Sequence, residues 1–314
     1  MIGTATMRPS TAEALRAAGL DPDHVADVVA RALDEDLAGG PDATTVATVP
    51  AGRMDTADLV ARAGGVVAGI PVASAVFDVV GLAAAGALPQ DPAGGSAIEV
   101  EPMRADGDRV RPGDTLLTVR GPTRALLIAE RTALNLLCHL CGVATLTRAW
   151  VDSLAGTGAT VRDTRKTVPG LRALQKYAVR RGGGENHRMA LSDAALVKDN
   201  HVAVAGGVAA AFTAVRSAFP DLPVEVECDS LEQVAAAMAA GADLILLDNM
   251  TTAELRRAVE LARPRGVRLE ASGGLTLDRA REVGETGVDY LAVGALTASA
   301  PALDIGMDLR ERQA

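Results

Sequence analysis

Short apolar runs alternate with helical stretches from residue 159 onward. Six runs of six residues each are typical of buried strands, and they cover 159–164, 194–199, 223–228, 243–248, 267–272 and 289–294. Between them, apolar residues recur at helical spacing over 207–219, 230–240, 252–262 and 277–285. Strands that alternate with helices predict a parallel sheet.

The spacing of these strands favours a barrel. Glu227, Asp248 and Ala271 lie near the ends of three successive runs and are 21 and 23 residues apart. Such regular βα units are typical of an α/β barrel, and six strands are too few to complete one. We therefore predict an α/β fold with an incomplete parallel barrel. A doubly wound open sheet is the weaker alternative, because no G-x-G-x-x-G turn follows a first strand.

The first half of the chain follows a different pattern. Helical spacing predicts helices over 24–37 and 124–149, whereas 106–122 has the pattern of strand, turn and strand. We expect a mixed α+β domain here, preceded by a poorly fixed lead-in over residues 1–23. The predicted domains are 1–129, the α+β domain, and 130–314, the barrel, with the final residues able to pack back on the first domain.

Composition and charge narrow the function. Lys and Arg number 31 against 40 Asp and Glu, a formal charge of −9, so a nucleic-acid partner is not expected. No apolar run reaches the length of a membrane span, and no membrane partner is expected. The N-terminus has no apolar signal segment, and three cysteines cannot form a disulfide framework. We therefore expect a cytoplasmic enzyme.

One stretch reverses this acidic balance. Nine Lys and Arg lie between Arg162 and Lys198 against three acidic residues, so the segment carries a charge of +6. Arg165, Lys166 and Lys198 follow strands, where parallel barrels place their active sites, and we expect them to bind anions. Four other members of the stretch are expected only to line the solvated face of a helix: Arg172, Lys176, Arg180 and Arg181.

Three further patterns add candidate chemistry. The glycine run of GGGENHR (182–188) permits a close approach to a ligand and places His187 beside Arg188. The acids Glu227 and Asp248 follow neighbouring strands, where they suit Mg²⁺ bound to a polyphosphate, or a cationic transition state. Helix capping is the alternative role, but four neighbours suit it better: Asp229, Ser230, Thr251 and Thr252.

Glycines after the last strands form the final pattern. Ser272, Gly273, Gly274 and Gly294 are typical of a phosphate-binding turn, or of ordinary βα turns. The Cys138-x-x-Cys141 pair has no second cluster to complete a zinc site, and we expect packed thiols. His201 suits a site contact or a structural role equally well.

Nine motifs in order resemble the quinolinate phosphoribosyltransferase family, also called nicotinate-nucleotide diphosphorylase (carboxylating). The likeness covers about residues 24–311 and is densest from 130 to 300. The motifs are ERTALN (130–135), TRKTVPGLR (164–172), KYAV (176–179), GGGENHR (182–188), KDNH (198–201), EVE (225–227), LDN (247–249), LEASGG (269–274) and TGVD (286–289).

The resemblance implies an enzyme of NAD biosynthesis. It would convert quinolinate and 5-phosphoribosyl-1-diphosphate to nicotinate mononucleotide, CO₂ and diphosphate, with Mg²⁺ as the cofactor. The family combines an N-terminal α/β sandwich with an incomplete barrel, and its chains pair head to tail as homodimers. These features are expected of this chain on the same ground.

The resemblance also implies residue roles. Arg165, His187, Arg188 and Lys198 would hold the quinolinate carboxylates, joined by Arg131 of the neighbouring subunit. Lys166 would contact diphosphate. Glu227 and Asp248 would lie near the ribose and Mg²⁺, and Ser272, Gly273, Gly274 and Gly294 would hold the 5-phosphate. One departure is Ala298, where relatives often have a histidine, so donor affinity is lower or His201 compensates.

Three rival functions stay open. A related transferase would use nicotinate or another acceptor, but a single carboxylate does not need so many cations. A non-catalytic sensor of quinolinate or a phosphosugar gains nothing from Glu227 and Asp248. A lyase that forms a Schiff base through Lys166 or Lys198 leaves the arginines unexplained.

Overall fold

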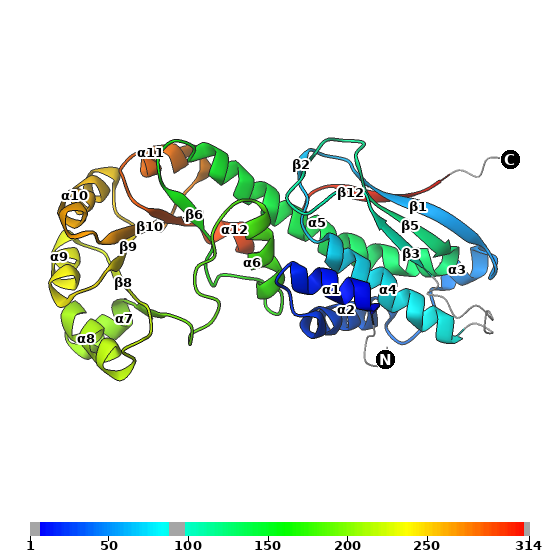
Figure 1. The fold of residues 1–314 in the computed structure, drawn as a ribbon, viewed down its shortest axis with the longest axis horizontal. Helices are drawn as coiled ribbons and strands as arrows, with labels where there is room; N and C mark the ends of the chain where they lie inside the picture. Colours follow the sequence, from blue (N-terminus) through cyan, green and yellow to red (C-terminus); the bar gives the residue numbers. More distant parts are fainter. Residues whose placement is uncertain (1–6, 88–97, 311–314) are drawn as a thin grey trace. The chain divides into compact units, whose positions relative to one another are not determined.

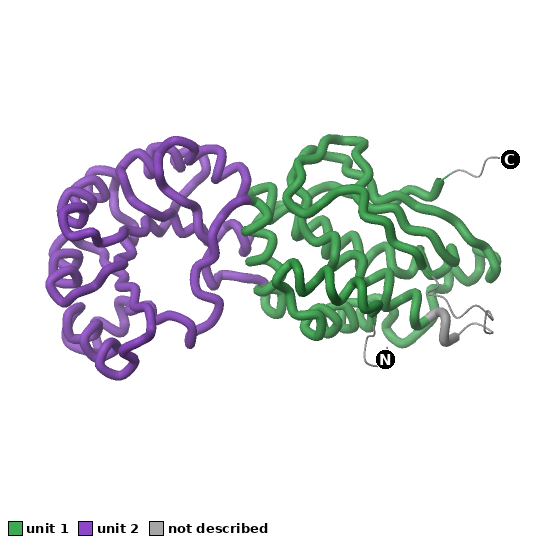
Figure 2. Tube along the Cα trace, viewed as in Figure 1, with its two compact units in different colours: residues 1–146, 169–182, 300–314 green, residues 147–168, 183–299 purple. Residues whose placement is uncertain are grey.

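The computed structural model describes residues 7–87 and 98–310, which form two compact units. Unit 1 comprises residues 1–146, 169–182 and 300–314, and unit 2 comprises 147–168 and 183–299 (Figure 2). The chain therefore passes from unit 1 to unit 2 and back twice. The predicted domain boundary between residues 129 and 130 falls inside a single helix, α5 (Thr123–Ser153).

Unit 2, all of whose residues are described, is built on a six-stranded parallel sheet. Each strand lies inside one of the six predicted runs. The strand order is β6-β11-β10-β9-β8-β7, and every neighbouring pair is parallel, as predicted for an incomplete barrel. The strands are β6 (Thr160–Arg162), β7 (Ala195–Val197), β8 (Val224–Cys228), β9 (Leu244–Asp248), β10 (Arg268–Ser272) and β11 (Tyr290–Ala292).

Helices cover the outer side of this sheet (Figure 1). Three of them match their predicted ranges closely: α8 (Val208–Ala218), α9 (Leu231–Ala240) and α10 (Thr252–Ala262). Ser230 and Thr251 cap α9 and α10 by accepting backbone N–H bonds, which confirms the predicted caps. The predicted helix over 277–285 is divided into a 3₁₀ turn, η2 (Leu277–Arg279), and α11 (Ala280–Gly284). Short elements complete the unit: α7 (Asp199–Ala205), η1 (Arg263–Arg265) and α12 (Ala295–Ala298).

The described part of unit 1 contains an antiparallel sheet of order β12-β1-β5-β3. The strands are β1 (Met54–Ala61), β3 (Glu99–Pro102), β5 (Thr115–Pro122) and β12 (Ile305–Leu309). The predicted strands within 106–122 both form, but they do not pair with each other. β4 (Arg109–Val110) pairs with β2 (Gly65–Val66), whereas β5 pairs with β1 and β3.

Unit 1 also contains the helices α1 (Pro9–Ala17), α2 (Pro22–Leu37), α3 (Ala43–Thr48), α4 (Ile70–Ala87) and the first part of α5. Helix α4 contacts β3 and β5 of the sheet, and α1 and α2 contact α4. The expectation of a poorly fixed lead-in over residues 1–23 is wrong for its described part. Leu15 of α1 is fully buried, and Thr11 Oγ1 donates to the buried carboxylate of Asp78 at 2.5 Å. Residues 1–6 lie outside the described residues.

Helix α5 is long and apolar enough to cross a membrane by length and composition alone. The prediction rested on uninterrupted apolar runs only, and it passed over this helix because charged residues interrupt it. Most of its apolar window is buried inside the structure, including Leu134, Leu137 and Val143. That burial is typical of the core helix of a globular unit.

The basic helix α6 (Arg172–Arg181) belongs to unit 1 and corrects one prediction. Lys176 was expected on a solvated face, yet its side chain is fully buried, as is that of Gln175. Arg181 lies over the Tyr177 ring, 5.1 Å from its centroid. The helix therefore packs its middle residues into unit 1 and leaves Arg180 exposed.

Candidate active site

Ten of the twelve predicted site residues line one cavity in unit 2, of about 610 Å³. The cavity lies at the carboxyl ends of β8, β9 and β10, where Glu227, Asp248 and Ser272 stand. This is the end at which parallel α/β folds bind their ligands. The ten residues are Arg165, Lys166, His187, Arg188, Lys198, Glu227, Asp248, Ser272, Gly273 and Gly274.

Two carboxylates lie near the ends of neighbouring strands. The Glu227 carboxylate forms an ion pair with the Lys198 ammonium, so this acid faces a cation that also lines the cavity. Asp248 accepts a hydrogen bond from Asn249 Nδ2 at 2.7 Å and pairs in register with Ser272 of β10. Hard carboxylate oxygens beside space for substrate oxygens are a donor set that fits Mg²⁺.

Two arginines bring positive charge to the same cavity. Arg165 Nε is buried and has no hydrogen-bond partner among the residues that the structure describes. Burial lowers the pKa of Arg188, and the charge of Arg165 lowers it further. Like charges held this close favour an anion between them, as a carboxylate or phosphate would be.

The loop of residues 182–188 is held by a buried acid. Asp163, fully buried after β6, accepts the His187 backbone N–H at 2.9 Å and Asn186 Nδ2 at 2.5 Å. Gly183 has φ +91°, and a Cβ there would lie 3.2 Å from Arg148 Nη1. The glycine run therefore permits this turn, and Asp163 fixes where it delivers His187 and Arg188.

Lys166 is positioned by the segment after β11. Thr297 Oγ1 donates to the Lys166 carbonyl oxygen at 2.8 Å, and a Cβ on Gly294 would lie 2.9 Å from Lys166 Cδ. Gly294 packs against a residue of the cavity but is not among its lining residues. Its predicted contact with a phosphate stays a prediction.

Arg131 lies on α5 in unit 1, where its side chain and that of Asn135 are exposed. The two residues are four apart, so they share one helix face among buried neighbours. The predicted role of Arg131 in the site of a neighbouring subunit stays a prediction.

Two weaker candidates have structural roles. His201 Nδ1 accepts the Lys198 backbone N–H at 2.9 Å, and this histidine does not line the cavity. Cys141 is fully buried, and its thiol contacts the backbone of Ala68. The expectation of packed cysteines is therefore confirmed for Cys141, whereas Cys138 is only partly buried.

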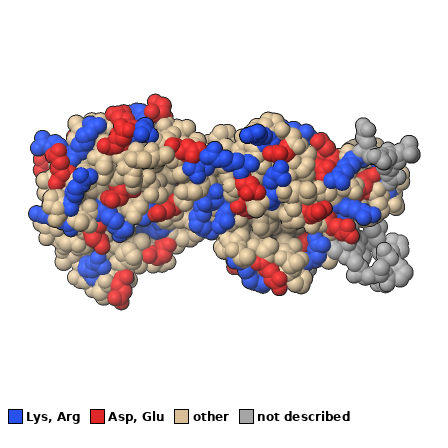
Figure 3. Space-filling model, turned by 45° about the horizontal axis from the view of Figure 1, so that its top comes forward, with Lys and Arg blue, Asp and Glu red and all other residues tan. Residues whose placement is uncertain are grey.

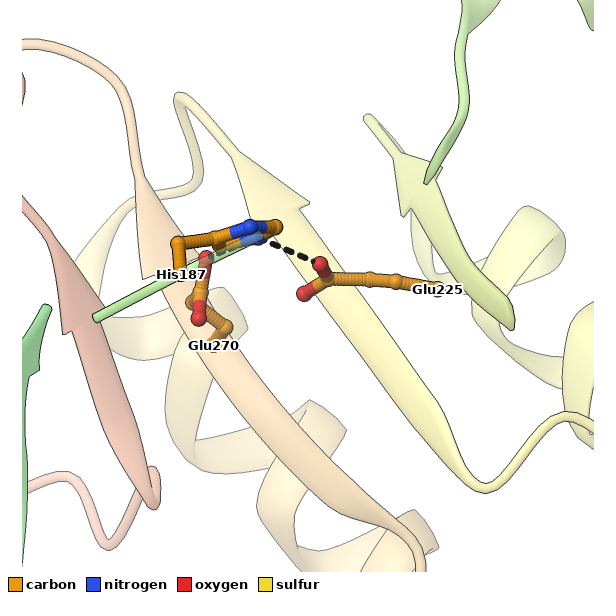
Figure 4. Close-up of side chains that lie close together, drawn as sticks. All are labelled: His187, Glu225 and Glu270. Carbon is orange, nitrogen blue, oxygen red and sulfur yellow. Dashed lines mark hydrogen bonds and ion pairs between the residues drawn. The ribbon is translucent and has the colours of Figure 1, made fainter. Parts of the chain in front are cut away.

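Sequence reasoning missed two buried glutamates, Glu225 and Glu270 (Figure 4), of which Glu270 lines the cavity. His187 Nε2 lies 2.7 Å from Glu225 Oε2 and 3.5 Å from Glu270 Oε1. Burial, and then the charge of Glu225, raises the pKa of Glu270 to about 7. The available signal was an acid in the middle of each apolar run, PVEVEC (223–228) and VRLEAS (267–272).

The pKa of His187 reflects opposing effects. Burial lowers it, but the hydrogen bond and charge of Glu225, together with the charge of Glu270, outweigh burial and raise the pKa overall. One ligand atom from each of His187, Glu225 and Glu270 lies within 4.8 Å of the others, close enough for a metal ion. Arg162 contacts Glu270 Oε2 at 3.1 Å, and this fixed cation disfavours a metal there.

The charge pattern outside the cavity is mixed. On the face that Figure 3 shows, lysine and arginine side chains are interspersed with aspartate and glutamate. The basic residues near the cavity are therefore a local concentration in an acidic chain, as expected from the sequence.

Comparison with known proteins gives one consistent result. Residues 42–141 match the family model described as quinolinate phosphoribosyl transferase, N-terminal domain, and residues 143–308 match the model of its C-terminal domain. The nicotinate-nucleotide pyrophosphorylase [carboxylating] of Mycobacterium leprae is 53% identical over 289 residues, which cover 91% of this chain and 98% of that protein.

Solved structures agree. The nicotinate-nucleotide pyrophosphorylase of Francisella tularensis is 34% identical with a TM-score of 0.84, covering 92% of this chain and 96% of that one. The enzyme of the same name from Ehrlichia chaffeensis is 35% identical with a TM-score of 0.82, covering 90% and 98%. The likeness therefore extends over both units of the chain.

Proposed function

Because this chain belongs to the quinolinate phosphoribosyltransferase family, we propose that it converts quinolinate and 5-phosphoribosyl-1-diphosphate to nicotinate mononucleotide, CO₂ and diphosphate in NAD biosynthesis. One observation carries the proposal: a single cavity is lined by four residues predicted to bind the acceptor and by three acids, among them Glu227 and Asp248. Two polyanionic substrates need fixed cations, and a cationic transition state needs a carboxylate.

The cations divide between the two substrates. Arg165 and Arg188 suit the quinolinate carboxylates because their guanidinium groups can bind a carboxylate through two parallel hydrogen bonds. Lys198 completes this part of the cavity once its ion pair with Glu227 is exchanged for substrate. Lys166 and the turn of Ser272, Gly273 and Gly274 are left for the donor's diphosphate and 5-phosphate.

Glu227 and Asp248 would hold Mg²⁺, whose bound charge helps to neutralise the diphosphate oxygens. The same two carboxylates face the ribose, where positive charge develops as the bond from C1 to the diphosphate oxygen breaks. Both roles require ionised acids at the same end of the sheet.

The reaction then balances without a covalent enzyme intermediate. The pyridine nitrogen attacks C1 of the ribose, and the diphosphate leaves with the electron pair of the broken bond. The ring becomes cationic, and its positive nitrogen stabilises the electron pair that remains on carbon 2 when the 2-carboxylate leaves as CO₂. A proton from the medium then occupies carbon 2. The protein's part is to bind, orient and stabilise charge.

We also propose that the active form is a homodimer. An apolar groove of about 830 Å³ on unit 2 leaves large hydrophobic side chains exposed, with Val204 91%, Leu191 68% and Phe219 61% accessible. Exposed apolar surface of this kind is typical of a protein interface. A second copy of the chain would cover it, and the partner's Arg131 would join the cations of the cavity.

The three free thiols suit a cytoplasmic location.

A product assay tests the reaction. Purified protein, Mg²⁺ and 5-phosphoribosyl-1-diphosphate are incubated with quinolinate in one reaction and nicotinate in another. We expect nicotinate mononucleotide and CO₂ from quinolinate only. Product from nicotinate only would replace the proposal with the related transferase. Binding of quinolinate without product from either acid would favour the sensor.

Complementation tests the shared site. R131A and E227Q chains are each expected to be nearly inactive alone, because one lacks the cation and the other lacks the acid. If Arg131 serves the neighbouring subunit, an equimolar mixture regains about a quarter of wild-type activity, since half of the random dimers contain one intact site. If Arg131 acts within its own chain, or not at all, the mixture regains nothing beyond the sum of its parts.

A further inference from the structure

The His187 ring is held on both of its nitrogens by the protein itself. Nε2 lies 2.7 Å from Glu225 Oε2, and Nδ1 accepts the backbone N–H of Arg188 at 2.7 Å. An Nδ1 that accepts a hydrogen bond carries no proton, so the proton is on Nε2 and is donated to Glu225. His187 is therefore committed to internal partners at both nitrogens, which is unexpected for a direct ligand of a substrate carboxylate.

The carboxylates that hold the ring are themselves held. Glu225 on β8 is 4% exposed and Glu270 on β10 is fully buried. Arg162 Nη1 donates to Glu270 Oε2 at 3.1 Å, and its guanidinium lies 3.4 Å from the centroid of the Tyr290 ring. The network thus ties the loop of residues 182–188 to strands β6, β8, β10 and β11 through side chains with little freedom to move.

Two carboxylate oxygens of the network remain unsatisfied. Glu225 Oε1 and Glu270 Oε1 are buried and have no hydrogen bond to any described residue. Unsatisfied buried polar atoms are costly, and they persist in proteins mainly where a function retains them. Apolar residues at these two strand positions would stabilise the fold more than glutamates do. The neighbouring positions of both runs are already apolar.

The network lies between two cavities. His187 and Arg188 line the candidate active site, and they also line a second cavity of about 440 Å³ beside Val224 and Leu244, the first residues of β8 and β9. Any tilt of the His187 ring would therefore move the floor of the active site. It would also move the Arg188 backbone, which hydrogen-bonds to the ring directly.

We propose that Glu225 and Glu270 are positioning residues, which fix the tautomer and orientation of His187 so that the ring holds Arg188 in place for the acceptor carboxylate. The proposal rests on the proposed function for the acceptor itself. It assigns Arg188 to direct contact with quinolinate, and it assigns His187 to support.

The first test is kinetic. E225L removes the acceptor of the Nε2 proton, whereas E225Q keeps an oxygen there. We expect E225L to raise the KM for quinolinate on the order of tenfold, with the KM for the phosphoribosyl donor unchanged, and E225Q to recover most of the loss. E185Q is the matched control, because Glu185 also contacts Arg162 but is half exposed and does not touch His187.

A double-mutant cycle separates support from direct contact. If Glu225 acts through Arg188, the effect of E225L disappears in an R188A background, since the residue to be positioned is gone. If His187 itself binds quinolinate, E225L weakens binding by the same factor with or without Arg188. That additive result overturns the proposal.

Nitrogen NMR of the histidine side chains does not require turnover, so the protonated nitrogen of His187 and its change in E225L can be measured even if quinolinate is not the substrate. At neutral pH we expect His187 to carry its proton on Nε2 in the wild type, with no change on addition of quinolinate. E225L should lose this preference. A shift of Nδ1 or Nε2 with quinolinate would show direct contact, and a shift with Zn²⁺ would show a metal centre. Either shift overturns the proposal.

Discussion

Asn249 lies so close to Gly273 that a Cβ on Gly273 would come within 2.6 Å of Asn249 Cγ. The Asn249 backbone N–H donates to the Ser272 carbonyl at 2.9 Å, and its side chain donates to Asp248. Asn249 itself has φ +55°, and Gly273 has φ +88°. The predicted metal-binding acid and the predicted phosphate turn therefore share one tightly packed junction between β9 and β10.

This junction predicts the effect of G273A. The added methyl group must displace Asn249, and with it both Asp248 and the turn at Ser272. We expect the KM for the phosphoribosyl donor to rise between about 10-fold and 100-fold, because small displacements of binding groups are costly. The KM for quinolinate should change little. Initial-rate kinetics with each substrate varied in turn measures both.

Gly241 offers a matched control for backbone strain. It ends α9 with φ +95°, and a Cβ there meets open space. G241A should cost about 1 kcal/mol of unfolding free energy from the left-handed conformation alone. Its kinetics should match the wild type. If G241A impairs donor binding as G273A does, general loss of stability rather than the junction explains both.

Glu227 predicts the metal dependence of the reaction. We expect a chelator to abolish activity and MgCl₂ to restore it. E227Q should lower kcat on the order of 100-fold, because a neutral amide neither holds Mg²⁺ well nor stabilises a cationic ribose. It should also raise the Mg²⁺ concentration needed for half-maximal rate. E232Q, on the exposed start of α9, is the control. Full activity in the chelator would contradict the metal assignment.

Thr251 predicts a separation between stability and chemistry. Its hydroxyl accepts the Glu254 backbone N–H, and Glu254 returns a bond to the Thr251 N–H at 2.8 Å, forming a capping box on α10. T251A should lower the unfolding free energy by about 1 kcal/mol, measured by urea denaturation, and leave kcat unchanged. D248N should lower kcat and leave the unfolding free energy unchanged. A large loss of unfolding free energy in D248N would show that Asp248, rather than Thr251 alone, caps the helix, and would contradict this prediction.

Unit 2 could be predicted from the sequence because its order is local. Each strand lies within an apolar run, helices separate most of the runs, and two of these helices have side-chain caps at Ser230 and Thr251. Parallel strands bring their carboxyl ends together. Positions at the ends of runs therefore became neighbours in the cavity. Unit 1 resisted prediction because its contacts are distant in sequence. Leu59 of β1 pairs with Met307 of β12, which no local pattern indicates.

The missed residues share one physical reason. An acid or a lysine within an apolar or helical pattern is normally interpreted as the solvated side of the element. Lys176, Glu225 and Glu270 are instead buried, and each has at least one interaction partner. The partners of the two glutamates come from other segments and compensate part of their polarity. His187 and Arg162, both distant in sequence from Glu270, are the partners of that glutamate. Such compensation becomes visible only once the chain is folded.

Glu270 predicts how stability changes with pH. Burial and the charge of Glu225 raise its pKa from 4.5 to about 7, so the folded protein keeps a proton that the unfolded chain has released. The stabilisation linked to this proton is complete below the unfolded pKa and is lost as the pH rises through the folded pKa. Wild-type protein should therefore lose unfolding free energy relative to E270Q between about pH 5 and about pH 8, since glutamine does not titrate. Urea denaturation of both proteins across this range measures the difference, with E185Q as a control whose curve should run parallel to the wild type. A constant difference between wild type and E270Q would show that Glu270 has an ordinary pKa in the folded protein.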